Sequence, residues 1–103
     1  MSGSGPAYVF YFIEAMTEAG IEMGLAPDQA QRLAIGTFTG ASALADSAHE
    51  PPAVLRERVT SKGGTTYAAI SALQQADVKG QFKTAIRAAQ KRAAELGEEF
   101  GRG

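Results

Sequence analysis

The sequence contains no cysteine, no tryptophan and a single histidine, His49. Without cysteine the chain can form no disulfide and offers no thiolate metal ligand, so we expect a reducing compartment and a cytoplasmic protein. One histidine also argues against a histidine metal site and against a Ser-His-Asp triad. We therefore predict no metal site, and we interpret His49 as a surface or helix-end residue without a catalytic role.

Long apolar runs and an excess of charge of one sign are also missing. No stretch of about 18 apolar residues is present, and no charged and then apolar leader precedes a cleavage site. Acidic and basic residues nearly balance, with a formal net charge of −1 at pH 7. We expect no membrane association, and the balanced charge lacks the basic surface that nucleic acid would require.

The 103 residues suit one small domain with a single core. No alternating strand pattern, internal repeat or low-complexity tract appears, so we predict an all-α helical bundle. Alanine is the commonest residue, which favours closely approaching helices over a core of large side chains. The helices are expected at about 6–23, 27–48, 53–58 and 66–75, with a break at 77–80 before a last helix.

The first predicted helix is apolar or aromatic on all sides between residues 7 and 13. A surface helix would carry its apolar residues along one stripe, so this segment requires cover on nearly every side. In so short a chain a second subunit explains that cover most simply, and we predict a homodimer. Glu14, Glu18 and Glu22 recur every four residues and are interpreted as the solvated strip of this helix.

Two later helices carry further patterns. Gly36 and Gly40 lie four residues apart in the second helix, a spacing that lets another helix backbone approach. The last helix has an apolar stripe at spacings of four and three, made of Phe82, Ile86, Ala89, Ala93, Leu96 and Phe100. A second line along it is interpreted as a solvated face rather than a nucleic-acid patch, and consists of Lys83, Arg87 and Lys91.

The functional site is predicted in residues 59–70, where a hydroxyl-rich turn with two adjacent glycines runs into the fourth helix. Gly63 and Gly64 let a ligand approach the main chain, and Thr65 or Thr66 is expected to cap the helix. Neither threonine has Glu or Gln three residues later, so the first amides stay free for a carboxylate or phosphate. The alternative is an ordinary capped turn, because Gly-Gly-Thr-Thr is common turn chemistry.

Several short motifs carry a resemblance to a known family. They are Ser-Gly-Ser-Gly-Pro-Ala-Tyr at 2–8, Gly-Leu at 24–25, Leu-Arg at 55–56 and Val-Thr-Ser-Lys-Gly-Gly-Thr-Thr at 59–66. In this order and spacing they resemble the C-terminal domain of pyrroline-5-carboxylate reductase, over nearly the whole chain from residue 2 to about 99. The Thr-Ser-x-Gly-Gly-Thr-Thr element is the most specific part of the resemblance.

The resemblance implies a helical dimerisation domain that interlocks with a second subunit, similar to the C-terminal domain of 6-phosphogluconate-dehydrogenase-like reductases. It implies a parent enzyme that reduces 1-pyrroline-5-carboxylate to L-proline with NADPH or NADH, in proline biosynthesis. The family's N-terminal dinucleotide-binding domain is expected to be absent from residues 1–103. This chain alone is therefore expected to be inactive and to bind no dinucleotide tightly, and assembly beyond the homodimer is left open.

By the same resemblance, the backbone around the two glycines and the hydroxyl that follows them bind the substrate. The corresponding residues are Ser61, Gly63, Gly64, Thr65 and Thr66. Thr66 is the catalytic residue, whose hydroxyl faces the ring nitrogen, and Val59 and Thr60 match a segment near the nicotinamide of the cofactor. Lys62 departs from the commonest family form, which has proline there, and we interpret it as a solvated loop lysine, with a contact to the anionic ligand as the alternative.

A second interpretation treats the chain as a free-standing, non-catalytic helical association module that keeps the glycine turn for structural reasons. The reading frame upstream of Met1 separates the two interpretations. A strand followed by Gly-x-Gly-x-x-Gly there would indicate part of an enzyme, whereas a genuine start site would favour the module.

Overall fold

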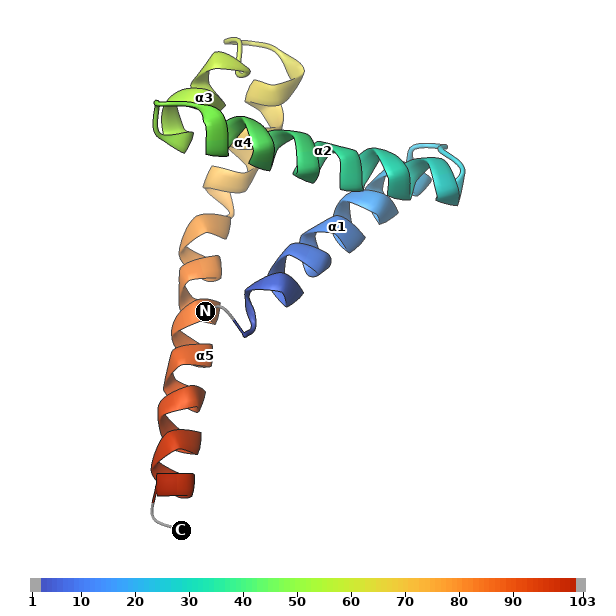
Figure 1. Ribbon diagram of the computed structural model, residues 1–103. Helices are drawn as coiled ribbons and strands as arrows, with labels where there is room; N and C mark the ends of the chain where they lie inside the picture. The colour runs from blue at the N-terminus through green and yellow to red at the C-terminus, as the bar shows by residue number, and fades with distance from the viewer. Residues whose placement is uncertain (1–2, 102–103) are drawn as a thin grey trace. The chain divides into compact units, whose positions relative to one another are not determined.

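The computed structural model describes the backbone of residues 3–101 and the side chains of residues 3–99, and these residues form five α-helices and no strand (Figure 1). The helices are α1 (Gly5–Glu22), α2 (Pro27–Ser47), α3 (Pro52–Arg58), α4 (Thr65–Gln75) and α5 (Val78–Gly101). The chain divides after Arg56 into two compact units. The predicted all-α class is confirmed, and the first four helices begin and end within one residue of the predicted positions.

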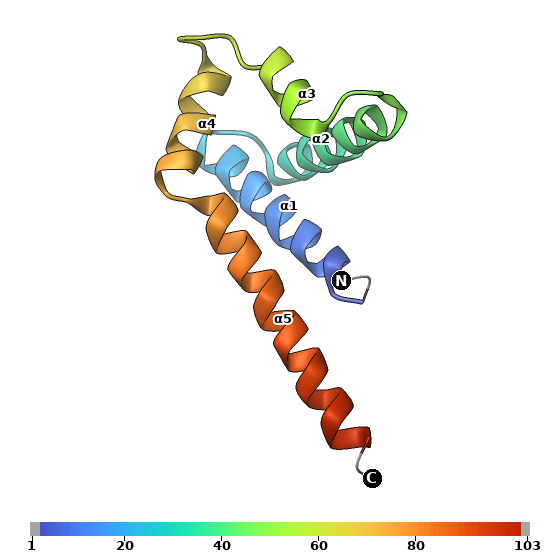
Figure 2. The same ribbon diagram turned by 90° about the vertical axis from the view of Figure 1, so that its left-hand side faces the viewer.

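The first unit is built on α1 and α2, which diverge from a short turn (Figures 1 and 2). Gly24 ends α1 in the left-handed region, with a φ of 105°, as expected of a glycine just beyond a helix end. Pro27 then begins α2 at a position where its missing N–H costs no hydrogen bond. The turn therefore follows directly from the local sequence signals.

Small residues bring α1 and α2 together close to this turn. A Cβ added to Gly20 would lie 3.2 Å from the Ala30 Cβ and 3.3 Å from the Leu25 Cδ1. Ala30 and Ala34 are 3% and 1% exposed, and they are the buried apolar side chains of the described chain. The helices therefore approach at Gly20. Around Gly36 and Gly40 an added Cβ would find nothing within 4 Å, so the predicted close approach is not made there within the described chain.

Large apolar side chains on both helices of this unit are exposed. Phe10 and Tyr11 on α1 are 63% and 67% exposed, and Leu33 and Leu44 on α2 are 54% and 56% exposed. Two buried alanines remove little apolar area from water compared with these larger side chains. Most of the apolar surface of α1 and α2 thus requires cover from outside this helix pair.

The second unit contains α4 and α5, which meet at a two-residue corner. Asp77, at a φ of 51°, accepts a hydrogen bond at its carboxylate from the Gly80 N–H at 3.3 Å, as an N-cap residue does. A Cβ at Gly80 would collide with that carboxylate. The predicted break at 77–80 is therefore wrong in its extent: α5 already begins at Val78, and Gly80 makes room for the capping side chain rather than ending a helix.

Beyond the corner, α5 extends as one long helix (Figure 2). Its predicted apolar stripe is half-buried at Phe82, Ile86, Ala89 and Leu96 and exposed at Ala93, and Phe100 lies outside the described side chains. None of the helices in the described chain is long and apolar enough to cross a membrane.

Candidate functional site

The predicted site begins with a tight turn of four residues, Ser61–Gly64. The Gly64 N–H donates a hydrogen bond to the Ser61 carbonyl oxygen at 2.9 Å and closes the turn. Gly63 is its third residue and has a φ of 80°, the value of a type II turn, which a residue with a Cβ adopts only under strain. Lys62 is its second residue, where proline is common because its φ is preset.

Gly64 is favoured for a different reason, which is the limited space beside it. Its own φ of −88° is unstrained, but an added Cβ would lie 3.1 Å from the Ser61 Oγ and 3.2 Å from the Ser61 carbonyl oxygen. Gly64 is also the N-cap residue of α4, and no side chain caps the helix. The prediction that Thr65 or Thr66 caps α4 is therefore wrong, because both threonines already lie in its first turn.

This helix start leaves its first amides open. The first hydrogen bond of α4 runs from the Ala68 N–H to the Gly64 carbonyl oxygen at 3.1 Å. Within the described chain the N–H groups of Thr65, Thr66 and Tyr67 meet no acceptor. Such a start carries about half a positive charge together with its free donors, which suits an anion. The Thr66 side chain is half-buried and that of Thr65 is exposed, so the two hydroxyls differ in their access to solvent.

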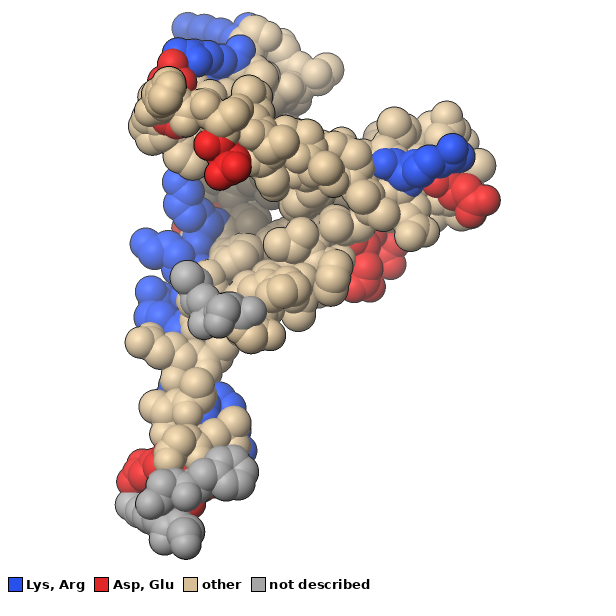
Figure 3. Space-filling view, viewed as in Figure 1, with Lys and Arg blue, Asp and Glu red and all other residues tan. Residues whose placement is uncertain are grey.

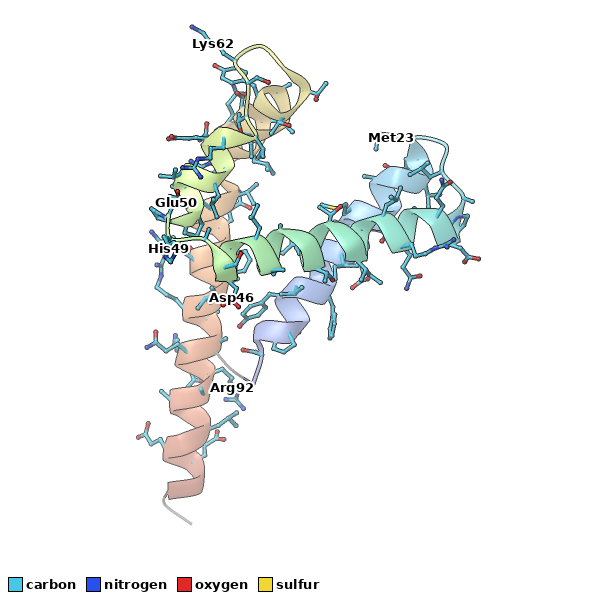
Figure 4. The ribbon with its side chains drawn as sticks, turned by 45° about the horizontal axis from the view of Figure 1, so that its top comes forward. Met23, Asp46, His49, Glu50, Lys62 and Arg92 are labelled. Carbon is cyan, nitrogen blue, oxygen red and sulfur yellow. The ribbon has the colours of Figure 1, made fainter. Side chains whose placement is uncertain are left out.

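The remaining predicted positions lie at or near this turn. Val59 directly follows the last residue of α3 and is 65% exposed in the described chain. Thr60 is half-buried, and its N–H donates to the Glu57 carbonyl oxygen at 3.1 Å. Lys62 extends away from the turn (Figure 4), in agreement with a solvated loop lysine.

His49 is exposed in the connection between α2 and α3 (Figure 4), as predicted. Among the residues that the structure describes, no three of the His, Asp and Glu side chains gather into a group that could hold a metal ion.

Two features of α1 were not predicted from the sequence. The Ser4 Oγ and the Tyr8 hydroxyl share a hydrogen bond at 2.8 Å across the first turn of α1, which explains the spacing of these residues in the Ser-Gly-Ser-Gly-Pro-Ala-Tyr motif. In addition, a hollow of about 270 Å³ opens between α1 and α2, and it is lined by Ile13, Glu14, Thr17, Glu18 and Gln31. The four-residue spacing of the glutamates was visible in the sequence, but the hollow beside them depends on the position of α2.

Comparison with known proteins then decides the family. A family model described as pyrroline-5-carboxylate reductase dimerisation matches residues 1–96. The chain belongs to this family. The pyrroline-5-carboxylate reductase of Pseudomonas aeruginosa is 46% identical over 98% of the chain, and that of Corynebacterium melassecola is 42% identical over 95%. These matches cover 37% and 36% of the two relatives, so the chain spans little more than a third of their length.

Solved structures of the family share the fold. A pyrroline-5-carboxylate reductase from Coxiella burnetii matches with a TM-score of 0.89 and 42% identity, over 93% of this chain and 36% of that chain. The Plasmodium falciparum enzyme, a structure with NADP bound, matches with a TM-score of 0.83 and 32% identity, over 85% and 34%. The resemblance inferred from the short motifs is therefore confirmed, and the helices correspond to the family's dimerisation domain.

Proposed function

We propose that this chain is the dimerisation and substrate-site domain of a pyrroline-5-carboxylate reductase, which reduces 1-pyrroline-5-carboxylate to L-proline with NADPH or NADH. The observation that carries the proposal is the uncapped start of α4, placed directly after the Ser61–Gly64 turn. The substrate has one carboxylate and one ring nitrogen. The open N–H groups at the start of α4 can donate hydrogen bonds to the carboxylate, and the nearby Thr66 hydroxyl can bond to the ring nitrogen.

The carboxylate is proposed to lie against the open N–H groups of Thr65, Thr66 and Tyr67, where charge-assisted hydrogen bonds and the helix dipole act together. Gly63 and Gly64 have no side chain to obstruct its approach, and the exposed Ser61 stands at the edge of the same turn. This arrangement would orient the ring by its charged end and bring its nitrogen near the first turn of α4.

Thr66 is proposed as the residue that faces the ring nitrogen. A hydroxyl both donates and accepts a hydrogen bond, so it can remain bonded while the nitrogen changes from imine to amine. Its contribution would be positioning and electrostatic stabilisation, because a threonine hydroxyl is too weak an acid to protonate the imine by itself. The half-buried position of the Thr66 side chain limits competition from water.

The described residues do not fit a dinucleotide cofactor. Such a cofactor is bound by a strand, a glycine-rich turn and a helix, and residues 3–101 contain no strand. We therefore propose that NADPH or NADH is bound by another part of the parent enzyme, with Val59 and Thr60 on the nicotinamide side. Residues 1–103 alone would then have no reductase activity.

A homodimer is proposed to supply the cover that α1 and α2 require. Phe10 and Tyr11 are more than half exposed, and the buried apolar residues of the described chain are alanines. An interlocked second copy would bury these side chains and contribute the apolar core that the single helix pair lacks.

The substrate site can be tested by titrating the isotopically labelled chain with L-proline and following the backbone amide resonances. We expect the amides of Thr65, Thr66 and Tyr67 to shift with L-proline and to stay in place with pyrrolidine, which has the ring nitrogen but no carboxylate. Thr66→Val should weaken binding, whereas the matched variant Thr65→Val should preserve it. Equal shifts with the two ligands would contradict a carboxylate site.

The activity is tested by adding a separately purified dinucleotide-binding domain of the family. NADPH oxidation driven by pyrroline-5-carboxylate should appear only in the mixture. NADPH oxidation by the 103-residue chain alone would refute the proposal that another part of the parent enzyme binds the cofactor. A stable dimer that neither responds to L-proline nor restores activity would support the association module instead.

A further inference from the structure

Lys62 is a cation without a partner close to the open start of α4. Its side chain is exposed and extends away from the tight turn at residues 61–64 (Figure 4), and within the described residues it forms no ion pair or hydrogen bond. Lys62 precedes Thr65 by three residues, so their Cα atoms lie at most about 11 Å apart. The charge of Lys62 therefore acts near the open N–H groups of α4 while the ammonium group stays in water.

No acidic residue offsets this charge along the neighbouring chain. Between Glu57 and Asp77, residues 58–76 contain Arg58 and Lys62 but no aspartate or glutamate. The start of α4 adds about half a positive charge of its own. Further basic side chains line α5 (Figure 3), which extends away from the start of α4 (Figure 2). The segment that holds the proposed carboxylate site is thus positively charged, in a chain whose formal net charge is −1.

The two ligands of the proposed reaction differ in net charge. With an uncharged imine nitrogen, 1-pyrroline-5-carboxylate has one net negative charge, that of its carboxylate. L-Proline at neutral pH has the same carboxylate and a protonated amine, so its net charge is zero. A cation at a distance responds to the net charge of a ligand, whereas the N–H groups of Thr65, Thr66 and Tyr67 respond to the carboxylate that both ligands share.

We propose that Lys62 is a specificity-determining residue that favours the net-anionic substrate over the zwitterionic product, through its charge and without touching either ligand. The inference rests on the substrate site proposed above. At a distance of about 10 Å and an effective dielectric constant of about 40–80, one unit charge changes the affinity for a monoanion by about two- to fourfold. The effect on a zwitterion is smaller, because its two opposite charges nearly cancel at that distance. Product therefore competes less well for the site.

The inference is tested on the isotopically labelled 103-residue chain with two probes. Tetrahydrofuran-2-carboxylate has a ring of the same size with oxygen in place of nitrogen, so it has one net negative charge, whereas L-proline has none. Dissociation constants are measured at low salt from the amide shifts of residues 65–67. Lys62→Gln should weaken the binding of tetrahydrofuran-2-carboxylate about two- to fourfold and change that of L-proline less than about 1.5-fold. Lys62→Arg keeps the charge and should bind both probes like the unmodified chain.

Lys91→Gln is the matched control. It removes the same charge from an exposed position on α5, away from the start of α4, and should leave the affinity for both probes unchanged. Salt provides a second control. At about 0.5 M the screening length falls to about 4 Å, so the difference between Lys62→Gln and the unmodified chain should disappear.

Three results would overturn the inference. If Lys62→Gln binds both probes like the unmodified chain, the charge of Lys62 does not act at the site. Equal losses for the two probes would show that Lys62 contacts the carboxylate they share. If neither probe shifts the amides of residues 65–67 in the unmodified chain, the proposed substrate site fails as well, which distinguishes that failure from a failure of Lys62 alone.

Discussion

The contact between α1 and α2 at Gly20 can be tested by adding a single methyl group. In Gly20→Ala the new Cβ would lie 3.2 Å from the Ala30 Cβ and 3.3 Å from the Leu25 Cδ1. Carbon atoms prefer about 3.5–4.0 Å. The leucine side chain can rotate away, but the Ala30 Cβ moves only with the backbone of α2. We therefore expect the two helices to separate by a few tenths of an ångström.

Two effects of opposite sign decide the result. Alanine favours a helix interior over glycine by about 1 kcal/mol, and overpacking a close contact costs roughly 1–3 kcal/mol. Gly97→Ala is the matched control, because Gly97 lies within α5 and an added Cβ there meets nothing within 4 Å. It should gain up to about 1 kcal/mol from propensity alone. The difference between the variants then isolates the contact, and we expect Gly20→Ala to be about 1–3 kcal/mol less stable than Gly97→Ala.

The assay is urea unfolding followed by circular dichroism. All proteins are compared at the same concentration, because the stability of an associating chain depends on concentration. If Gly20→Ala were as stable as Gly97→Ala, the close approach at Gly20 would not be a feature of the folded protein.

Two further outcomes are expected. Gly63→Ala should lose about 1–2 kcal/mol of unfolding free energy, because its φ of 80° strains a residue with a Cβ. Gly63→Asn should lose less, and equal losses in urea unfolding would argue against that backbone angle. Arg92→Ala should change stability by less than about 1 kcal/mol, since its ion pair with Glu95 is exposed at both side chains. A larger loss in the same assay would contradict this.

Features governed by neighbouring residues could be predicted from the sequence. Gly24 and Pro27 mark the turn between α1 and α2, because glycine can adopt the positive φ that ends α1 and proline has the fixed φ that suits the start of α2. The tight turn before α4 follows in the same way from its two glycines. The local pattern indicated an anion site or an ordinary turn, and the proposed role of those residues in binding a particular substrate rests on the resemblance to a family.

The predictions that were wrong concern helix ends and helix contacts for which more than one residue matched the sequence pattern. Either threonine could have capped α4, yet the extended backbone of Gly64 ends the turn one residue earlier. Gly80 resembled a helix break, but the Asp77 carboxylate occupies the space beside it. Gly36 resembled a packing position as much as Gly20 did. Only the course of α2 relative to α1 determines which glycine is at the contact.

The turn that precedes α4 also bears on the order of events during folding. A hydrogen bond between Gly64 and Ser61 closes it, and the next bond joins Ala68 to Gly64. Every atom that orients the open amides therefore belongs to one contiguous run of eight residues, 61–68. The hydrogen bonds of this run are local, and helix–coil relaxation of a short segment takes about a microsecond or less. An isolated helix of 11 residues is only marginally stable, so the proposed anion site forms quickly but is kept in place by the packing of α4.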